Sequence, residues 1–286
     1  MNDRAASQTV AHDTALAQPS LVDPALLKIG GQVFEYQSIP PSRAALPTLV
    51  LLHEALGSVA LWRDFPERIA LATGCQVLSW SRQGYGHSSP LAGPRTPRYL
   101  HDEAIEQMPA VLAALQIDQP VLIGHSDGGS IALIHAAAFP DRVAGLVVIA
   151  PHEFVEHEAL AGIRRAGEAY ASGRLRNRLA AFHRDADRVF DAWHDTWLSE
   201  NFRDWDIRDC LPAIRCPILA IQGEDDEYAT MRQIECIAES CADVELLKLA
   251  DCRHSPHRDQ PERVIAAIVR FVDRLSTRGD KAPEAC

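Results

Sequence analysis

The chain has 286 residues, of which 47% are hydrophobic and 23% charged, and its formal net charge is -11. This length and composition are typical of a soluble globular protein with a sizeable core, arranged as one large domain or two smaller ones. The acidic balance argues against sequence-independent binding of nucleic acid, which needs a basic surface to displace counterions, and against docking on an anionic membrane.

The termini and the cysteines bear on the cellular compartment. No run approaches the ~18 apolar residues of a membrane span. Residues 1–18 have no continuous apolar core of the kind that a secretory signal contains. Seven cysteines at irregular spacing, without a C-x-x-C pair, fit free thiols in a reducing compartment better than a disulfide framework. We therefore expect a cytoplasmic protein with a flexible N-terminal extension over residues 1–25.

The first half of the chain alternates strand-like and helix-like segments. Residues 26–37 contain two short strands, separated by a hairpin turn at Gly30 and Gly31. Continuous apolar runs predict further strands that are covered on both faces, as in a parallel sheet. These strands are residues 47–52, 76–80, 120–123 and 143–150.

Helices are predicted between these strands. They are residues 61–72, 100–115 and 128–138. Within the second of them the apolar side chains recur at helical spacing, so that they share one face. The residues of this face are Ile105, Met108, Leu112 and Leu115.

The alternation stops at Pro151. From there to residue 209 the chain carries helix-like runs, no strand-like run and three of its five tryptophans. The alternation returns with strands at 217–222 and 244–249 and helices at 230–239 and 261–275. We therefore expect an α/β fold with a mostly parallel sheet flanked by helices. Its parts are a core of residues 26–150 and 210–275, an inserted helical lid over residues 151–209, and a flexible tail over residues 276–286.

One short stretch, Gly124-His125-Ser126-Asp127-Gly128, stands between a predicted strand and a predicted helix. In a very tight turn the residues two before and two after the apex approach each other, and a Cβ on either would clash. Both are glycine around Ser126, whereas the corresponding neighbours of Asp127 are His125 and Gly129. The turn therefore presents Ser126, with its hydroxyl clear of the backbone, and excludes Asp127 as a nucleophile.

A serine hydroxyl is a poor nucleophile at neutral pH, so it needs a base, and that base must be oriented by an acid. In a doubly wound sheet, reactive groups collect at the carboxyl ends of the strands. Residues 223–226 (Gly-Glu-Asp-Asp) follow one of the last two strands, and residues 251–254 (Asp-Cys-Arg-His) follow the other. An acid and a histidine can therefore converge on Ser126, in the chain order Ser, Asp, His.

Four motifs in this order resemble those of the α/β-hydrolase superfamily, over about residues 26–275. The serine turn resembles its nucleophile elbow, and residues 53–57 (His-Glu-Ala-Leu-Gly) resemble its His-Gly-x-x-Gly oxyanion loop. Residues 223–226 match its Gly-x-x-Asp acid turn, and residues 254–261 resemble its terminal motif of a histidine followed by an acid and a proline. Glu54 departs from the pattern, since glycine is usual there. A positive φ at Glu54 would store about 1–3 kcal/mol of strain.

The resemblance implies an α/β-hydrolase fold, with a mostly parallel eight-stranded sheet flanked by helices and with the inserted helical lid. It also implies three catalytic roles: Ser126 as the nucleophile, Asp226 as the orienting acid and His254 as the general base. The implied oxyanion donors are the backbone N–H groups of Ala55 and Asp127. No cofactor and no metal are implied.

Other residues near these motifs are either alternatives for a catalytic role or structural. Asp225 is the alternative to Asp226 as the acid, although its position relative to the preceding glycine fits less well. We interpret His53 as a brace of the oxyanion loop, His125 as a packed neighbour of the turn that points away from the cleft, and His257 as a structural residue at a helix start.

In the lid, His152 and His157 suggest a zinc site. They are five residues apart, however, whereas two ligands on one helix face are three or four apart, so we expect no metal. His152 either lines the substrate pocket or is a plain loop histidine. Trp193 and Trp197 either line an apolar pocket or pack the lid onto the body.

These observations predict a serine hydrolase that cleaves small carboxylic esters or lactones through an acyl-enzyme on Ser126. Its partner is a small ester-type substrate, with no nucleic acid, membrane or cofactor. Carbon–carbon bond hydrolases, enol-lactonases, cofactor-free perhydrolases and acyl-CoA thioesterases share this fold and triad, because substrate choice lies in the lid and pocket. A hydrolase-like small-molecule receptor that retains its triad is the alternative from another class.

Overall fold

The computed structural model describes residues 23–279. Residues 1–22 and 280–286, which hold most of the predicted flexible extension and tail, lie outside the described residues. The described part contains eight strands. They are β1 (Ala25–Ile29), β2 (Gln32–Ile39), β3 (Leu49–Leu52), β4 (Val77–Trp80), β5 (Val121–His125), β6 (Gly145–Ile149), β7 (Ile218–Gly223) and β8 (Val244–Leu249).

All eight strands form one sheet in the order β1-β2-β4-β3-β5-β6-β7-β8. β2 pairs antiparallel with both β1 and β4, and every other neighbouring pair is parallel. The prediction of a mostly parallel, eight-stranded α/β-hydrolase sheet is therefore confirmed. Because β3 and β5 to β8 run parallel, the loops after them meet at one edge of the sheet.

Helices connect the strands. They are α1 (Phe65–Thr73), α2 (Tyr99–Asp102), α3 (Met108–Ala114), α4 (Asp127–Ala138), α5 (His157–Ala171), α6 (Arg174–Leu179), α7 (Ala186–Leu198), α8 (Arg232–Ser240), α9 (Pro256–Asp259) and α10 (Pro261–Gly279). Short 3-10 helices are η1 (Val59–Trp62), η3 (Glu200–Phe202) and η4 (Arg208–Ala213), and η2 (Glu103–Gln107) is a π-helical turn.

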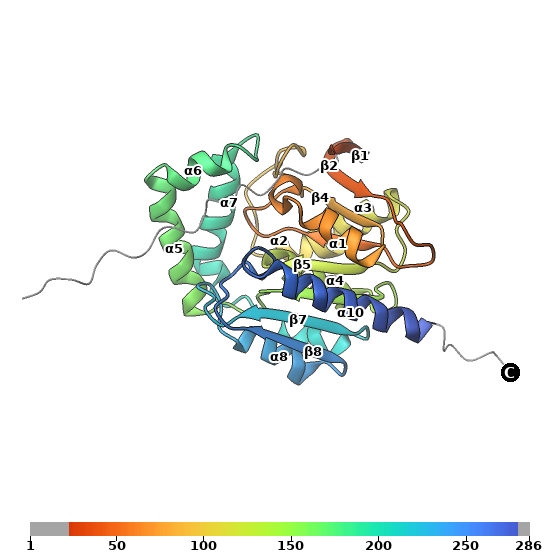
Figure 1. Cartoon of the computed structure of the whole chain (residues 1–286). Coiled ribbons are helices and arrows are strands. Elements are labelled where there is room, and N and C mark those ends of the chain that lie inside the picture. The colour runs from red at the N-terminus through yellow and green to blue at the C-terminus, as the bar shows by residue number, and fades with distance from the viewer. Residues whose placement is uncertain (1–22, 280–286) are drawn as a thin grey trace, which may run out of the picture.

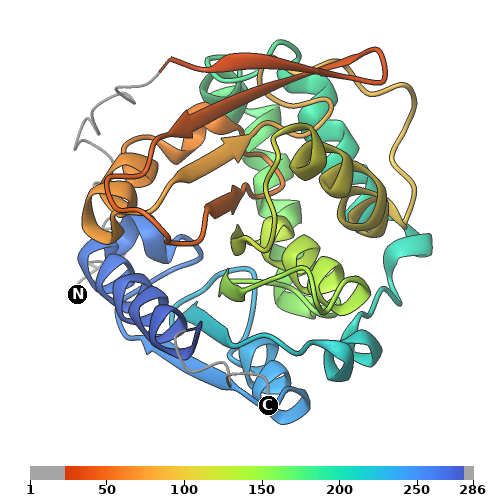
Figure 2. The ribbon, with the colours of Figure 1, turned by 90° about the vertical axis from the view of Figure 1, so that its right-hand side faces the viewer.

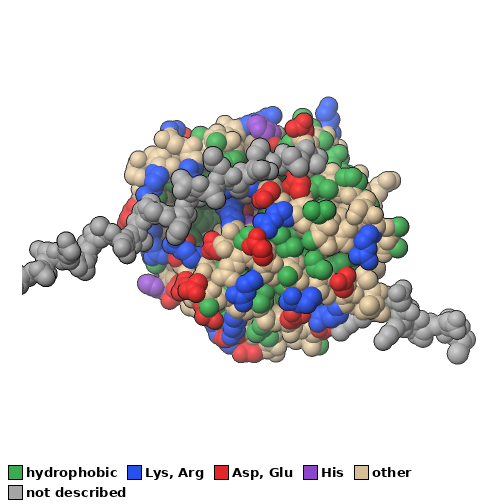
Figure 3. Space-filling model, viewed as in Figure 1, with side chains coloured by type: hydrophobic (Ala, Val, Ile, Leu, Met, Phe, Trp, Pro, Cys, Tyr) green, Lys and Arg blue, Asp and Glu red, His purple; other side chains and the backbone are tan. Residues whose placement is uncertain are grey.

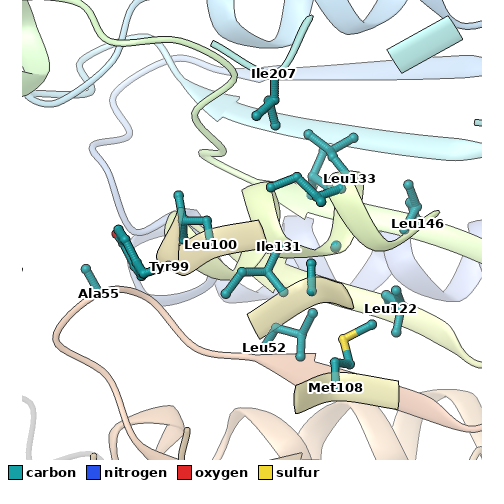
Figure 4. Packing of buried hydrophobic residues seen from close by; sticks show 14 of the residues in the cluster. Leu52, Ala55, Tyr99, Leu100, Met108, Leu122, Ile131, Leu133, Leu146 and Ile207 are labelled. Carbon is teal, nitrogen blue, oxygen red and sulfur yellow. The ribbon is translucent and has the colours of Figure 1, made fainter. Parts of the chain in front are cut away.

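The sheet lies between two apolar layers. Along β3, Leu49 and Leu51 face one layer, and Val50 and Leu52 face the other, as the alternation of a strand requires. In Figure 2, α1 (orange) and α10 (blue) cover one face, and α3 and α4 (yellow to green) cover the opposite face. Figure 4 shows part of the second layer, where Leu52 gathers with side chains from α3 and α4.

The segment predicted as one helix over residues 100–115 is instead α2, the π turn η2 and α3 in succession. Ile105, predicted to share one apolar face with Met108, is 39% exposed, whereas its neighbour Ala104 is fully buried. A π turn holds more residues than an α-helical turn, so the residues that face the core change along the helix. Met108 and Leu112, which follow the turn in α3, lie together on the buried face.

The last helix is longer than predicted. We expected it to end at residue 275, but α10 continues to Gly279. Within this added turn the hydroxyls of Ser276 and Thr277 donate hydrogen bonds to carbonyl oxygens of the helix itself, so these polar groups are satisfied inside the helix. Glycine is the residue at which helices commonly stop.

Between β6 and β7 the chain forms α5, α6 and α7, which we call the helical insertion (residues 151–209). Figure 1 shows these three helices together at one end of the molecule. An aromatic cluster lies at the end of α7: the Trp197 ring lies 4.9 Å from Phe202 and 6.0 Å from Trp205, and the rings of Phe202 and Trp205 stack 5.3 Å apart. The insertion therefore packs through large apolar side chains.

No helix within residues 23–279 combines the length and the apolar character that crossing a bilayer requires. On the face drawn in Figure 3, acidic and basic side chains are interspersed. The cysteines of the described part are unpaired. They are Cys75, Cys210, Cys216, Cys236, Cys241 and Cys252.

Candidate active site

Ser126 occupies the turn between β5 and α4, with φ 53° and ψ -120°. A Cβ on Gly124 would lie 2.2 Å from the carbonyl oxygen of Gly128, and a Cβ on Gly128 would lie 2.0 Å from the carbonyl oxygen of Leu52. Both positions therefore require glycine, as the sequence predicted. A positive φ at a serine costs about 1–3 kcal/mol, which the packing of this turn must offset.

Three side chains from the ends of three strands form one hydrogen-bonded chain. His254 Nε2 lies 3.1 Å from Ser126 Oγ, and His254 Nδ1 lies 2.9 Å from each carboxylate oxygen of Asp226. Because a carboxylate only accepts, Nδ1 carries the proton and Nε2 presents its lone pair to the serine hydroxyl. The Asp226 side chain is fully buried, and that of His254 is 13% exposed.

The ionisation states of His254 and Asp226 depend on each other. Burial disfavours the charged form of His254, but Asp226, together with the charges of Glu227 and Glu54, outweighs burial and raises the pKa of the ring. Burial likewise disfavours the charge of Asp226, but His254 and the N–H of Tyr228 hold its pKa below the usual range. Asp226 therefore stays ionised, while His254 accepts a proton readily.

Asp226 has two further donors. Gln222 Nε2 donates to Oδ2 over 2.6 Å, and the N–H of Tyr228 donates to Oδ1 over 2.8 Å. Asp225, the alternative acid, is exposed, and its N–H donates to the carbonyl of Cys252. The structure thus places Asp226, and not Asp225, against His254.

The predicted oxyanion donors lie at the start of α4 and in the loop after β3. Asp127 is the first residue of α4, where N–H groups have no intrahelical acceptor. Ala55 is buried in the 53–57 loop after β3. Glu54 is not among the described non-glycine residues with a positive φ, so the strain considered for this position is absent.

His53 braces this loop. Its Nδ1–H donates to the Glu54 carbonyl over 2.7 Å, and its Nε2 accepts from the N–H of Arg82 over 3.1 Å. Burial, with the Arg82 charge, lowers the pKa of His53 well below its ordinary value. The neutral ring therefore has one donor and one acceptor, which match its two partners.

The side chain of Asp127 connects the site to the helical insertion. It accepts a hydrogen bond of 2.6 Å from the Tyr99 hydroxyl, which in turn accepts one of 2.8 Å from the indole N–H of Trp197 on α7. Arg82 Nη2 lies 3.9 Å from the same carboxylate. All four residues are buried. This buried chain joins the first turn of α4 to α7.

The predicted pocket residues lie at different distances from the site. The His152 ring lies 5.7 Å from the His254 ring and 5.2 Å from Trp197, and burial lowers the pKa of His152 to about 3. Trp197 is 2% exposed, and Trp193 packs edge-on against Phe190 of the same helix. The structure therefore brings neutral His152 to His254, and it places both tryptophans in the packing of α7.

The two histidines weighed as zinc ligands differ in environment. His152 is buried, whereas His157 is exposed at the start of α5. Within residues 23–279, no three or more His, Cys, Asp or Glu side chains are grouped so that they could hold a metal ion.

Several residues of this region were missed from the sequence. Gln222 carried a usable signal, because it is a polar residue at the end of an otherwise apolar strand, and the structure shows it buried. Tyr99 carried none, because it meets Asp127 and Trp197 only in the folded chain. His183 of the insertion carried no sequence signal either. It accepts a hydrogen bond from the Gly86 N–H and contacts the Leu56 carbonyl, and both residues are far from it in the chain.

A sheet of this order, with Ser126, His254 and Asp226 hydrogen-bonded at its carboxyl edge, defines an α/β-hydrolase. The chain belongs to the alpha/beta hydrolase family, whose model matches residues 49–267.

Curated relatives match in part of their length. The chain is 30% identical over 118 residues to 1-acylglycerol-3-phosphate O-acyltransferase ABHD5 of Rattus norvegicus, which covers 41% of this chain and 33% of that protein. It is 28% identical over 189 residues to serine hydrolase BPHL of Homo sapiens, which covers 63% of this chain and 64% of that protein. The chain thus spans between a third and two thirds of these relatives.

Among solved structures, the enol-lactonase from Burkholderia xenovorans LB400 superimposes with a TM-score of 0.67 at 20% identity. The superposition covers 87% of this chain and 100% of that chain. At this identity the likeness shows the shared fold.

Proposed function

We propose that this protein is a serine hydrolase that cleaves small carboxylic esters or lactones through an acyl-enzyme on Ser126. The observation that carries the proposal is the hydrogen-bonded chain from Ser126 Oγ through His254 to buried Asp226. Serine at a strand-to-helix turn, a base with its lone pair toward that serine and an ionised acid behind it are the parts that acyl transfer needs.

The first half of the proposed reaction forms the acyl-enzyme. Ser126 Oγ attacks the carbonyl carbon while its proton passes to His254 Nε2, and Asp226 stabilises the imidazolium that forms. The N–H groups of Asp127 and Ala55 hold the negative oxygen of the tetrahedral intermediate. Each such donor contributes about 3–4 kcal/mol of transition-state stabilisation. When the intermediate collapses, the carbon–oxygen bond to the alcohol breaks, and His254 protonates the leaving oxygen.

The second half releases the acid. A water molecule gives its proton to His254 Nε2 and attacks the acyl carbon, and the bond to Ser126 Oγ then breaks as that oxygen regains the proton. The raised pKa of His254 favours its role as the proton acceptor in both halves.

Other features support the chemistry and its setting. One relative is named a serine hydrolase, and one structural neighbour is named an enol-lactonase. We place neutral His152, beside His254, at the substrate pocket. The unpaired cysteines of the described part support a reducing compartment, so we propose a cytoplasmic enzyme.

The test compares wild type with Ser126→Ala on p-nitrophenyl acetate, p-nitrophenyl butyrate and a simple lactone. We expect many turnovers for wild type and a loss of kcat of at least about a thousandfold for the variant. Ser172→Ala, which changes an exposed serine at the end of α5, is the matched control and should keep wild-type kcat. More than a tenth of wild-type kcat in folded Ser126→Ala would overturn the proposal, and a single acylation without turnover would favour the receptor.

A further inference from the structure

Glu54, whose side chain is 18% exposed, carries a carboxylate in the 53–57 loop, where the family usually has glycine. Its Oε2 lies 3.6 Å from His125 Nδ1, and its Oε1 lies 3.4 Å from Arg258 Nη2. Burial disfavours the charge, but the contact with His125 and the charge of Arg258 outweigh it and hold the pKa of Glu54 well below its usual range. The loop therefore contributes a fixed negative charge that the reaction described above does not use.

The fold provides a specific place for this carboxylate. A Cβ on Gly57 would lie 2.5 Å from Glu54 Oε2 and 2.8 Å from His53 Cβ, so only glycine leaves room for the side chain. On the other side, Arg258 Nη2 donates to the Leu61 carbonyl over 2.9 Å, which fixes the guanidinium beside Oε1. The position of the Glu54 carboxylate is thus set by the 53–57 loop, η1 and α9 together.

The ring of His125 lies between this carboxylate and the backbone of His254. His125 Nε2 is 2.8 Å from the His254 carbonyl oxygen, and because a carbonyl only accepts, Nε2 carries a proton. The opposite nitrogen, Nδ1, faces Glu54. The ring is 2% exposed, with its centroid 5.2 Å from the His254 ring and 4.7 Å from that of His257. Within residues 23–279 Nδ1 makes no hydrogen bond, so its contact with the Glu54 carboxylate is attractive only as an ion pair, when Nδ1 carries a proton as well as Nε2. Rotation of this packed ring would break the bond to the His254 carbonyl and this ion pair.

We propose that Glu54 and His125 are positioning residues for His254. Glu54 orients the His125 ring, His125 holds the backbone of His254, and the 53–57 loop and the His254 loop thereby keep one relative position. His125 directly precedes Ser126 and Asp127, Ala55 lies in the 53–57 loop and His254 in its own loop, so the alignment of the proposed nucleophile, oxyanion donors and base depends on this contact. The inference rests on the proposed function, since it assigns both residues to the reaction at Ser126.

A second consequence concerns charge at His254. The groups that face it from other elements are Asp226, Glu227, Tyr228, His152, His125 and Glu54. On its own segment Arg253 and His257 adjoin it, and burial lowers the pKa of His257 well below its ordinary value. Among the acidic groups, Glu54 raises the pKa of His254 together with Asp226 and Glu227. Neutralising Glu54 therefore destabilises the imidazolium and lowers the pKa of His254.

The experiment measures kcat, KM and the pH profile of kcat/KM on p-nitrophenyl acetate for Glu54→Gln, Glu54→Asp and His125→Phe. A displaced base lowers kcat, so we expect a drop of about 10- to 100-fold in each variant, with KM within about twofold. Glu54→Gln should also move the acid limb to lower pH by on the order of half a unit. Glu54→Asp, which keeps the charge and loses reach, should leave the limb in place.

Two comparisons separate this inference from simpler effects. Glu262→Gln, at an exposed glutamate paired with Arg68, is the matched control and should change neither kcat nor the acid limb. The double variant Glu54→Gln/His125→Phe should be no slower than the slower single variant, because both changes break the same contact.

Each outcome decides the inference. If Ser126→Ala keeps activity, the proposed function fails, and the positioning role fails with it. If Ser126→Ala is inactive but Glu54→Gln keeps wild-type kcat and acid limb, only the positioning role fails. If Glu54→Gln does not fold, as judged by circular dichroism, His125→Phe decides alone: kcat within twofold of wild type overturns the inference, and the expected loss supports it.

Discussion

The α/β core and the helical insertion use their polar side chains differently. In the core, Ser126, His254 and Asp226 hydrogen-bond to one another, an arrangement in which His254 can accept the serine proton while Asp226 stays ionised. In the insertion, Trp197 donates its N–H outward to Tyr99, and its ring packs among other aromatic rings. The proposed reacting groups therefore lie in the core, and the insertion carries contacts that attach it to the core.

His183 is a second polar residue of the insertion that attaches it to the core. It lies between α6 and α7, its Nδ1 accepts from the Gly86 N–H over 3.0 Å, and its Nε2 lies 3.0 Å from the Leu56 carbonyl oxygen. Burial lowers the pKa of His183, which keeps the ring neutral and both bonds intact. The insertion is thus fastened to the loops after β3 and β4, close to the proposed oxyanion donors. We therefore expect substitutions in the core to change activity, and substitutions in the insertion to lower the stability of the fold before they change activity.

After substitution of Ser126, substitution of Asp226 should have the largest effect on activity. We expect Asp226→Asn to lower kcat/KM by about three to four orders of magnitude, because the amide cannot hold the working tautomer of His254 or stabilise its charged form. Asp225→Asn, one residue away and exposed, should stay within about twofold of wild type. The measurement is kcat/KM on p-nitrophenyl acetate for both purified variants, and the reverse ranking would move the acid to Asp225.

The next effect is the dependence on pH. His254 must be neutral to accept a proton, and its pKa is raised above the ordinary value near ~6.5. Activity should therefore fall as pH drops through a value above about 6.5, by about tenfold for each further unit. The profile of kcat/KM between pH 5 and 9 measures this, with circular dichroism at each pH as the control for unfolding. A midpoint well below 6 would contradict the assignment of His254 as the base.

The smallest effect concerns Trp197. Trp197→Phe keeps the ring packing but removes the hydrogen bond to Tyr99, so we expect a loss of about 1 kcal/mol in stability, or a few degrees in Tm. The ratio of kcat/KM for a bulky ester over an acetate ester should stay within about twofold of wild type. Trp193→Phe is the matched control, since within residues 23–279 no hydrogen bond joins its indole to another side chain. A tenfold change in the ratio for Trp197→Phe would place this residue in the substrate pocket.

The sequence predicted what local patterns determine. The glycines around Ser126 predicted the turn because their Cβ atoms would have met backbone atoms, and strand ends predicted where Asp226 and His254 would lie. The π turn at η2 was missed because its apolar spacing is also compatible with a regular helix, and so Ile105 was assigned to the wrong face. Tyr99 could not be assigned, because its contacts with Asp127 and Trp197 join residues far apart in the chain. The same holds for the contacts of the Glu54 carboxylate.

The central claim is that Ser126 carries the acyl group during turnover, and it can be observed directly. Wild type is mixed with p-nitrophenyl butyrate, quenched in acid within milliseconds, digested and analysed by mass spectrometry. The account predicts a butyryl group on the peptide that contains Ser126, formed as fast as p-nitrophenol is released, and no such adduct in Ser126→Ala. Two results would contradict it. One is continued turnover with the adduct on another residue. The other is the absence of an adduct in wild type together with undiminished turnover in Ser126→Ala.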